Sequence, residues 1–177
     1  MAKSNFKEIK LTPTEELRPI EVYFKRLDDT HQNPTNRLLA WLCVPLLVFG
    51  LFGIAWGLPF PNLQFMGPYN VYFNWASFFI AFAVYFYLKL SPLLSYFFLF
   101  VLMVFSYGVM RLAGWQQAGG IPLWILSCLI TLFALGGLYI GSQMEAKRQS
   151  LKTTAELVLV SPLWVLYTAL KRFKIKY

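Results

Sequence analysis

Four long stretches with no charged residue are the feature that most constrains how this chain can fold. They cover residues 38–58, 71–88, 93–110 and 121–140. A helix needs about 20 mainly apolar residues to cross about 30 Å of hydrocarbon. Because the bilayer interior offers no water to the backbone, each stretch must satisfy its own peptide groups, and we predict four transmembrane helices.

The composition agrees with a membrane protein and argues against other classes. Hydrophobic residues make up 58% of the 177 residues and charged residues only 14%, whereas soluble domains average about 45–50% and about 25%. The net charge of +8 lies almost entirely near the two ends, so no basic surface for nucleic acid is predicted. Cys43 and Cys128 lie in apolar runs and form no CxxC pair, which predicts core thiols rather than a zinc site or a disulfide.

The connections between the four stretches are short, which predicts an antiparallel bundle. The chain is therefore predicted to be all-α, an integral membrane four-helix bundle over residues 38–140. Residues 1–37 form an N-terminal cytoplasmic segment that is too long and too acidic for a signal-peptide n-region. Within it, Pro19 precedes an expected interfacial helix over residues 20–27.

Residues 141–177 are expected to form a cytoplasmic C-terminal region in three parts. A polar helix over 143–154 lies at the headgroups, and a short apolar run over 157–170 follows it. That run contains Pro162 and is too short to span, so a re-entrant or interfacial segment is expected. The tail over 171–176 alternates basic and apolar residues and is expected to bind anionic lipid.

The distribution of Lys and Arg predicts the orientation. Of the 16 Lys and Arg residues, only Arg111 falls on the side opposite the termini. Short positively charged loops stay in the cytoplasm, so both termini are predicted to be cytoplasmic.

The spans carry no ionisable side chain of the kind that transporters use, which disfavours an ion-coupled transporter. The glycine pairs 53/57 and 137/141 have spacings that we interpret as helix packing. A functional site is therefore expected at the cytoplasmic interface. The candidates there are His31 and Asn36 before the first span, and Ser142 and Glu145 after the fourth.

The candidates before the first span and those after the fourth span lie at the same membrane depth, so we expect that they can meet. His31 is the only histidine in the chain, and one imidazole cannot by itself hold a non-haem iron. A structural interpretation is favoured for His31 and Asn36, since Asn33-Pro34 suits the cap and first residue of a helix.

The segment from His31 to Ala40, followed by Pro45, resembles the signature of the 2-hydroxy fatty acid dioxygenase family. These are small membrane proteins of fatty-acid alpha-oxidation, with many bacterial relatives. The family pattern is a His, an Asn five positions later, a second His nine positions after the first, and then a Pro. His31, Asn36 and Pro45 match this pattern, whereas Ala40 stands at the second histidine.

Two further segments are similar to the family, and the similarity extends from about residue 20 to 171. Around residues 139–148 the matching residues are Gly141, Glu145 and Arg148, but Ser142 replaces the family histidine. The segment 161–164 resembles the last family patch, and Thr168 stands where the family has a Glu. The resemblance implies that family members hold a ferrous ion at the positions of His31, Ala40 and Ser142. Losing two imidazoles and a carboxylate is expected to remove most iron affinity.

Three hypotheses follow. The leading one is a dioxygenase-like pseudoenzyme with a degraded iron site and no expected cofactor. It binds a membrane lipid of acyl, 2-hydroxy fatty acid or sphingoid type, or a membrane partner. The second is an active Fe²⁺ dioxygenase in which His31 ligates with Glu145 and Asp28 or Asp29. The third is a structural membrane protein that forms an oligomer. The family's wide bacterial distribution and the lack of a retention signal favour a bacterial inner membrane over the endoplasmic reticulum.

Overall fold

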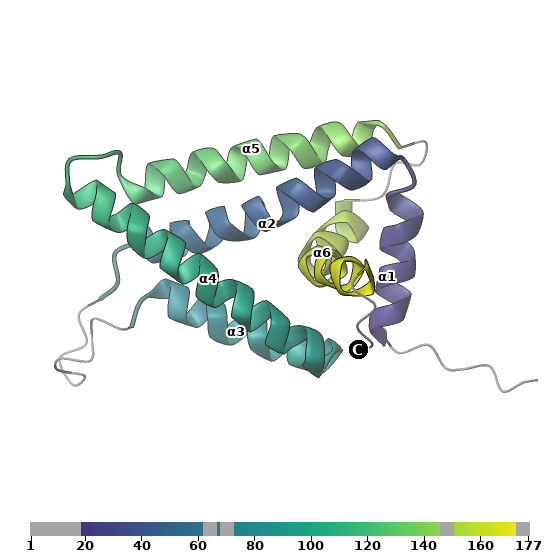
Figure 1. The fold of residues 1–177 in the computed structure, drawn as a ribbon, viewed down its shortest axis with the longest axis horizontal. Helices are drawn as coiled ribbons and strands as arrows, with labels where there is room; N and C mark the ends of the chain where they lie inside the picture. The colour runs from purple at the N-terminus through teal and green to yellow at the C-terminus, as the bar shows by residue number, and fades with distance from the viewer. Residues whose placement is uncertain (1–18, 62–66, 68–72, 146–150, 173–177) are drawn as a thin grey trace, which may run out of the picture.

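The computed structural model describes residues 19–61, 67, 73–145 and 151–172, with the side chains of 19 and 151–156 excepted. In these ranges the regular structure is helical, and the all-α prediction is confirmed (Figure 1). The helices of the described ranges are α1 (Pro19–Thr30), α2 (Pro34–Gly57), α3 (Trp75–Leu90), α4 (Pro92–Gln117), α5 (Leu123–Gln143) and α6 (Leu151–Arg172).

Three of these helices, α2, α4 and α5, are long and apolar enough to span a membrane. The expected second span is shorter than predicted. Helix α3 has 16 residues, about 24 Å at 1.5 Å per residue, and begins at Trp75 rather than at residue 71. The cause is Asn74, whose side-chain oxygen accepts a hydrogen bond from the Ser77 N–H at 3.1 Å and caps the helix. Residues 71 and 72 lie outside the described ranges.

Helices α2 and α5 lie side by side along most of their length (Figure 1). Glycines allow this close approach. A Cβ at Gly50 would overlap Thr131 Oγ1 and lie 3.0 Å from the Thr131 backbone nitrogen, and a Cβ at Gly137 would overlap Cys43 Sγ. At the far end, a Cβ at Gly57 would lie 3.3 Å from Trp124 Cβ. A Cβ at Gly53 would overlap Ser127 Oγ, so the packing interpretation is confirmed for Gly53, Gly57 and Gly137, and Gly50 adds a contact that was not predicted.

Helices α3 and α4 form a tight hairpin. The Ser91 backbone N–H donates to Tyr87 O at 2.8 Å, and Pro92 starts α4, where its missing N–H costs nothing. The Tyr87 ring packs edge-on against Phe98 with ring centres 4.7 Å apart. Ser95 Oγ donates to Val84 O at 3.2 Å and ties the two helices together.

Helix α6 differs most from the prediction. The sequence led us to expect a polar helix over 143–154 and a separate apolar run, but α6 is one helix from Leu151 to Arg172 that continues through Pro162. A proline leaves the carbonyl four residues earlier without its N–H partner. Here that carbonyl belongs to Val158, and Ser161 Oγ donates to it at 2.6 Å. This bond lets the helix pass the proline.

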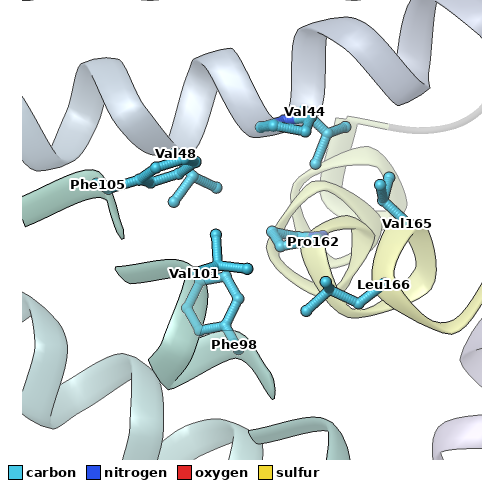
Figure 2. A pocket seen from close by; sticks show the side chains of 9 residues that line it. Val44, Val48, Phe98, Val101, Phe105, Pro162, Val165 and Leu166 are labelled. Atoms are coloured by element: carbon cyan, nitrogen blue, oxygen red, sulfur yellow. The ribbon is translucent and has the colours of Figure 1, made fainter. Parts of the chain in front are cut away.

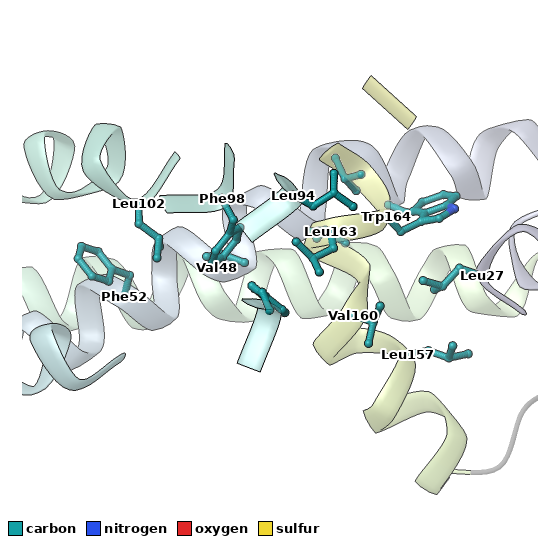
Figure 3. Packing of buried hydrophobic residues seen from close by; sticks show 14 of the residues in the cluster. Leu27, Val48, Phe52, Leu94, Phe98, Leu102, Leu157, Val160, Leu163 and Trp164 are labelled. Carbon is teal, nitrogen blue, oxygen red and sulfur yellow. The ribbon is translucent and has the colours of Figure 1, made fainter. Parts of the chain in front are cut away.

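Helix α6 runs nearly along the line of sight in Figure 1, across the direction of α2 and α5. It contacts both α2 and α4, and α1 crosses it on the other side. The Phe24 and Tyr167 rings stack at 4.5 Å between α1 and α6, and Tyr87 OH donates to Leu159 O at 2.8 Å between α3 and α6. Figure 3 shows that buried side chains of α1, α2, α4 and α6 form one apolar core.

Tryptophans mark one level of the molecule. Trp56, Trp75, Trp115 and Trp124 lie at the ends of α2 to α5 that are remote from the α1–α2 turn. Along α2, Arg37 and Trp56 are separated by about 28 Å, which is close to the thickness of a hydrocarbon layer. Tryptophan is enriched at membrane interfaces. This spacing supports a bilayer between the two levels and indicates a membrane protein.

Candidate functional site

The α1–α2 turn brings the N-terminal candidates to the end of α5. Helix α1 ends at Thr30, and Asn33 caps α2 by accepting a hydrogen bond from the Thr35 N–H at 2.9 Å. Pro34 occupies the first helical position, where its fixed φ suits the helix. The predicted capping role of Asn33-Pro34 is therefore confirmed.

Glu145, just after α5, binds this turn directly. Its Oε1 accepts hydrogen bonds from the Asn33 backbone N–H at 3.0 Å and from Asn36 Nδ2 at 2.9 Å. Asn36 is only 3% exposed and also donates to Thr30 O at 3.2 Å. One turn before Glu145, a Cβ at Gly141 would overlap Asn36 Oδ1, so a glycine is needed there. We call Asn33, Asn36 and Glu145 the latch.

The latch keeps the Glu145 carboxylate charged. Burial alone would raise the pKa of this carboxyl, but the hydrogen bonds from Asn36 and from the Asn33 backbone outweigh it, and the pKa lies below its ordinary value. A carboxylate at the N-terminus of α2 also interacts favourably with the helix dipole. The arrangement is that of a structural contact between α2 and α5.

His31 lies beside the latch but is bonded elsewhere. Its Nδ1 is 2.9 Å from Leu27 O and 3.0 Å from Thr30 Oγ1. Because a carbonyl can only accept, we assign the hydrogen of the neutral ring to Nδ1 and the lone pair to Nε2. Burial lowers the pKa of His31 and outweighs both the Leu27 hydrogen bond and the charge of Glu145, which raise it. The ring packs on Trp164 with centres 5.0 Å apart.

Trp164 of α6 completes the cluster, although its place in an apolar run did not predict a site residue. Its Nε1–H donates to Asp28 Oδ1 at 3.0 Å, and the Arg37 guanidinium carbon lies 5.8 Å from its ring centre. Arg37 Nη2 lies 3.9 Å from Asp28 Oδ1, and both side chains are about half-exposed. This ion pair therefore adds little stability. Asp29 is exposed.

The three residues that depart from the family motifs, Ala40, Ser142 and Thr168, supply no imidazole or carboxylate for an iron ion. Ala40 is 1% exposed within the core. Ser142 Oγ donates to Tyr139 O at 2.7 Å, and Thr168 Oγ1 donates to Trp164 O at 2.7 Å. Over the described ranges, no three His, Cys, Asp or Glu side chains come together as a metal-binding group. Within the part of the chain that the structure describes, His31 and Glu145 are thus near each other but are not joined by a third such side chain.

A second feature was not predicted from the sequence: an apolar pocket of about 220 Å³ between α2, α4 and α6 (Figure 2). Its walls come from three residues on each helix: Val44, Pro45 and Val48 of α2, Phe98, Val101 and Phe105 of α4, and Pro162, Val165 and Leu166 of α6. No periodicity signals such a space, because it exists only where α6 crosses between the other two helices.

No family model, curated protein or solved structure matches this chain. The resemblance to the 2-hydroxy fatty acid dioxygenase family thus stays a prediction from the three motifs.

Proposed function

We propose that this chain is a membrane protein that binds a lipid, with one hydrocarbon tail seated in the pocket between α2, α4 and α6. The pocket carries this proposal. The pocket is partly open rather than enclosed and has a volume of about 220 Å³, so a hydrocarbon tail from the surrounding bilayer can enter it. A dry apolar cavity of about 150 Å³ is already large enough to bind benzene.

The depth of the pocket suits a lipid tail. Val44 and Val48 lie about 10 Å and about 16 Å along α2 from Arg37, at 1.5 Å per residue. The hydrocarbon layer is about 30 Å thick, so the pocket falls within the leaflet on the side of the α1–α2 turn. On the predicted orientation this is the cytoplasmic leaflet, whose acyl chains reach that depth.

The chemistry of the walls supports hydrocarbon over a polar ligand. Each of the nine lining side chains is apolar, and a polar group placed there would lose its hydrogen bonds to water without replacement. Acyl and sphingoid lipids both end in a tail that meets this requirement. The residue types at the family's iron positions, with Ala40 and Ser142 in place of histidine, favour binding over iron-dependent oxidation.

Photo-crosslinking in vesicles tests the proposal. The probe is a fatty acid with a diazirine near its terminal methyl, and the readout is the crosslinked peptide. The blocking variant is Val101→Trp, which fills the pocket from α4. The matched control is Val104→Trp, because Val104 is 53% exposed on the same helix and does not line the pocket.

We expect wild type and V104W to crosslink within α2, α4 or α6 at the pocket, and V101W to lose that signal about tenfold or more. Equal crosslinking of V101W and V104W would show that the probe reports only general contact with the bilayer. That result would refute lipid binding in the pocket.

A further inference from the structure

Two aromatic rings lie at the end of the pocket remote from α6: Phe105 lines the pocket, and Phe49 packs against Phe105. In Figure 2, Phe105 lies with Val48 at the opposite end from Pro162. The Phe105 ring packs edge-on against Phe49, with ring centres 5.3 Å apart and an interplanar angle of 85°. We call Phe49 and Phe105 the floor of the pocket.

Neighbouring atoms limit how far the Phe49 ring can move away from the pocket. A Cβ at Gly108 would lie only 3.1 Å from Phe49 Cε2, so the Phe49 ring already rests on the backbone of α4. One turn further along the two helices, Phe52 and Val109 are fully buried in the core. Space beyond the floor is therefore already filled with side chains.

We propose that Phe105 sets the length of hydrocarbon tail that the pocket accepts. This inference rests on the proposed lipid binding and adds a specificity-determining residue to it. The ligand class is a lipid with an unbranched tail whose terminal methyl meets the Phe105 ring. Because the pocket lies within the hydrocarbon layer, each further methylene that enters it gains van der Waals contacts with the walls. Affinity therefore rises with chain length until the tail reaches Phe105 and then stops rising.

The experiment is a chain-length series of saturated fatty acids that compete with the photo-crosslinking probe in vesicles. Phe105→Ala removes the ring at this end of the pocket, and we expect the rise in affinity with chain length to continue to longer chains than in wild type. The control is Phe100→Ala, because Phe100 is 64% exposed on the same helix and faces away from the core. It should keep the wild-type limit.

A second variant keeps the test decisive if Phe105→Ala does not fold. Phe105→Trp enlarges the floor and is expected to move the limit to shorter chains. An unchanged limit in the folded Phe105 variants, with competition still saturable in wild type, would overturn this inference alone. Failure of any fatty acid to compete in wild type would instead overturn the proposed lipid binding, so the two failures are distinguishable.

Discussion

Removing the Glu145 carboxylate should destabilise the contact between α2 and α5. In Glu145→Ala, the buried Asn36 amide keeps only its bond to Thr30 O, and the Asn33 N–H loses its partner. A hydrogen bond to a charged group is worth about 1.5–3 kcal/mol. Glu145 is only partly buried and water partly replaces the lost partners, so we expect a total loss of about 2 kcal/mol.

Thermal unfolding of purified protein in mild detergent measures this effect. A loss of about 2 kcal/mol corresponds to a fall in Tm of about 4–8 °C for a chain of this size. Glu145→Gln keeps an acceptor oxygen and should lose about half as much. The matched control is Ser142→Ala, since Ser142 is exposed and its hydroxyl donates to Tyr139 O within its own helix turn; its change should stay within about 0.5 kcal/mol.

The same bonds predict a pH dependence. Because the pKa of Glu145 lies below its ordinary value of 4.5, its stabilising effect is fully present above that pH. It is lost as the pH falls through the lowered pKa. Glu145→Gln should remove this loss in acid. Equal Tm values for Glu145→Ala and Ser142→Ala near neutral pH would refute the reasoning, because the carboxylate would then contribute nothing to the fold.

Three further changes test other parts of the structure. Gly50→Val should cost about 1–3 kcal/mol by overpacking the α2–α5 contact, whereas Gly136→Ala, with open space around it, should leave Tm unchanged; equal effects would contradict the packing. Burial holds the pKa of His31 below 6.5, so the unfolded chain binds the proton first and stability should fall as the pH drops below about 6.5. His31→Gln should flatten the Tm profile between about pH 7 and about pH 5, and an unchanged slope would count against a buried neutral ring. Cysteines placed at Lys89 and Arg111 should label from opposite sides of sealed vesicles, the first from the cytoplasmic side; labelling of both from the same side would contradict a span by α4, and exchanged sides would reverse the orientation.

Local rules predicted much of this molecule. Uncharged apolar length was enough to locate α2, α4 and α5, and the Asn33-Pro34 pair identified the start of α2 to the residue. The meeting of Asn36 with Glu145 also followed from topology, because spans that begin and end on one side bring their flanks to one level. These features depend on a few neighbouring residues or on counting segments.

Features that depend on distant contacts could not be predicted. Pro162 suggested a break, and only the Ser161 bond to the Val158 carbonyl explains why α6 continues. The start of α3 was misplaced because Asn74 lies in an apolar run, where its cap competes with the spanning pattern. The pocket needs α6 to lie across α2 and α4, a placement fixed by tertiary contacts such as Tyr87 OH to Leu159 O.

Trp164 connects the latch region to the pocket. Its ring packs on His31 and its Nε1–H binds Asp28, while the next two residues of α6, Val165 and Leu166, line the pocket. If ring packing positions α6, Trp164→Phe should cost about 1 kcal/mol and keep the wild-type chain-length limit, because the ring remains. Trp164→Ala leaves a void, should cost about 3–5 kcal/mol and should alter the limit by letting α6 shift. Should Trp164→Phe change the limit as much as Trp164→Ala, the hydrogen bond to Asp28 would be what positions this wall of the pocket. The contact of Trp164 with exposed Asp28 of α1 would then set the chain-length limit more than the packing of the apolar core does.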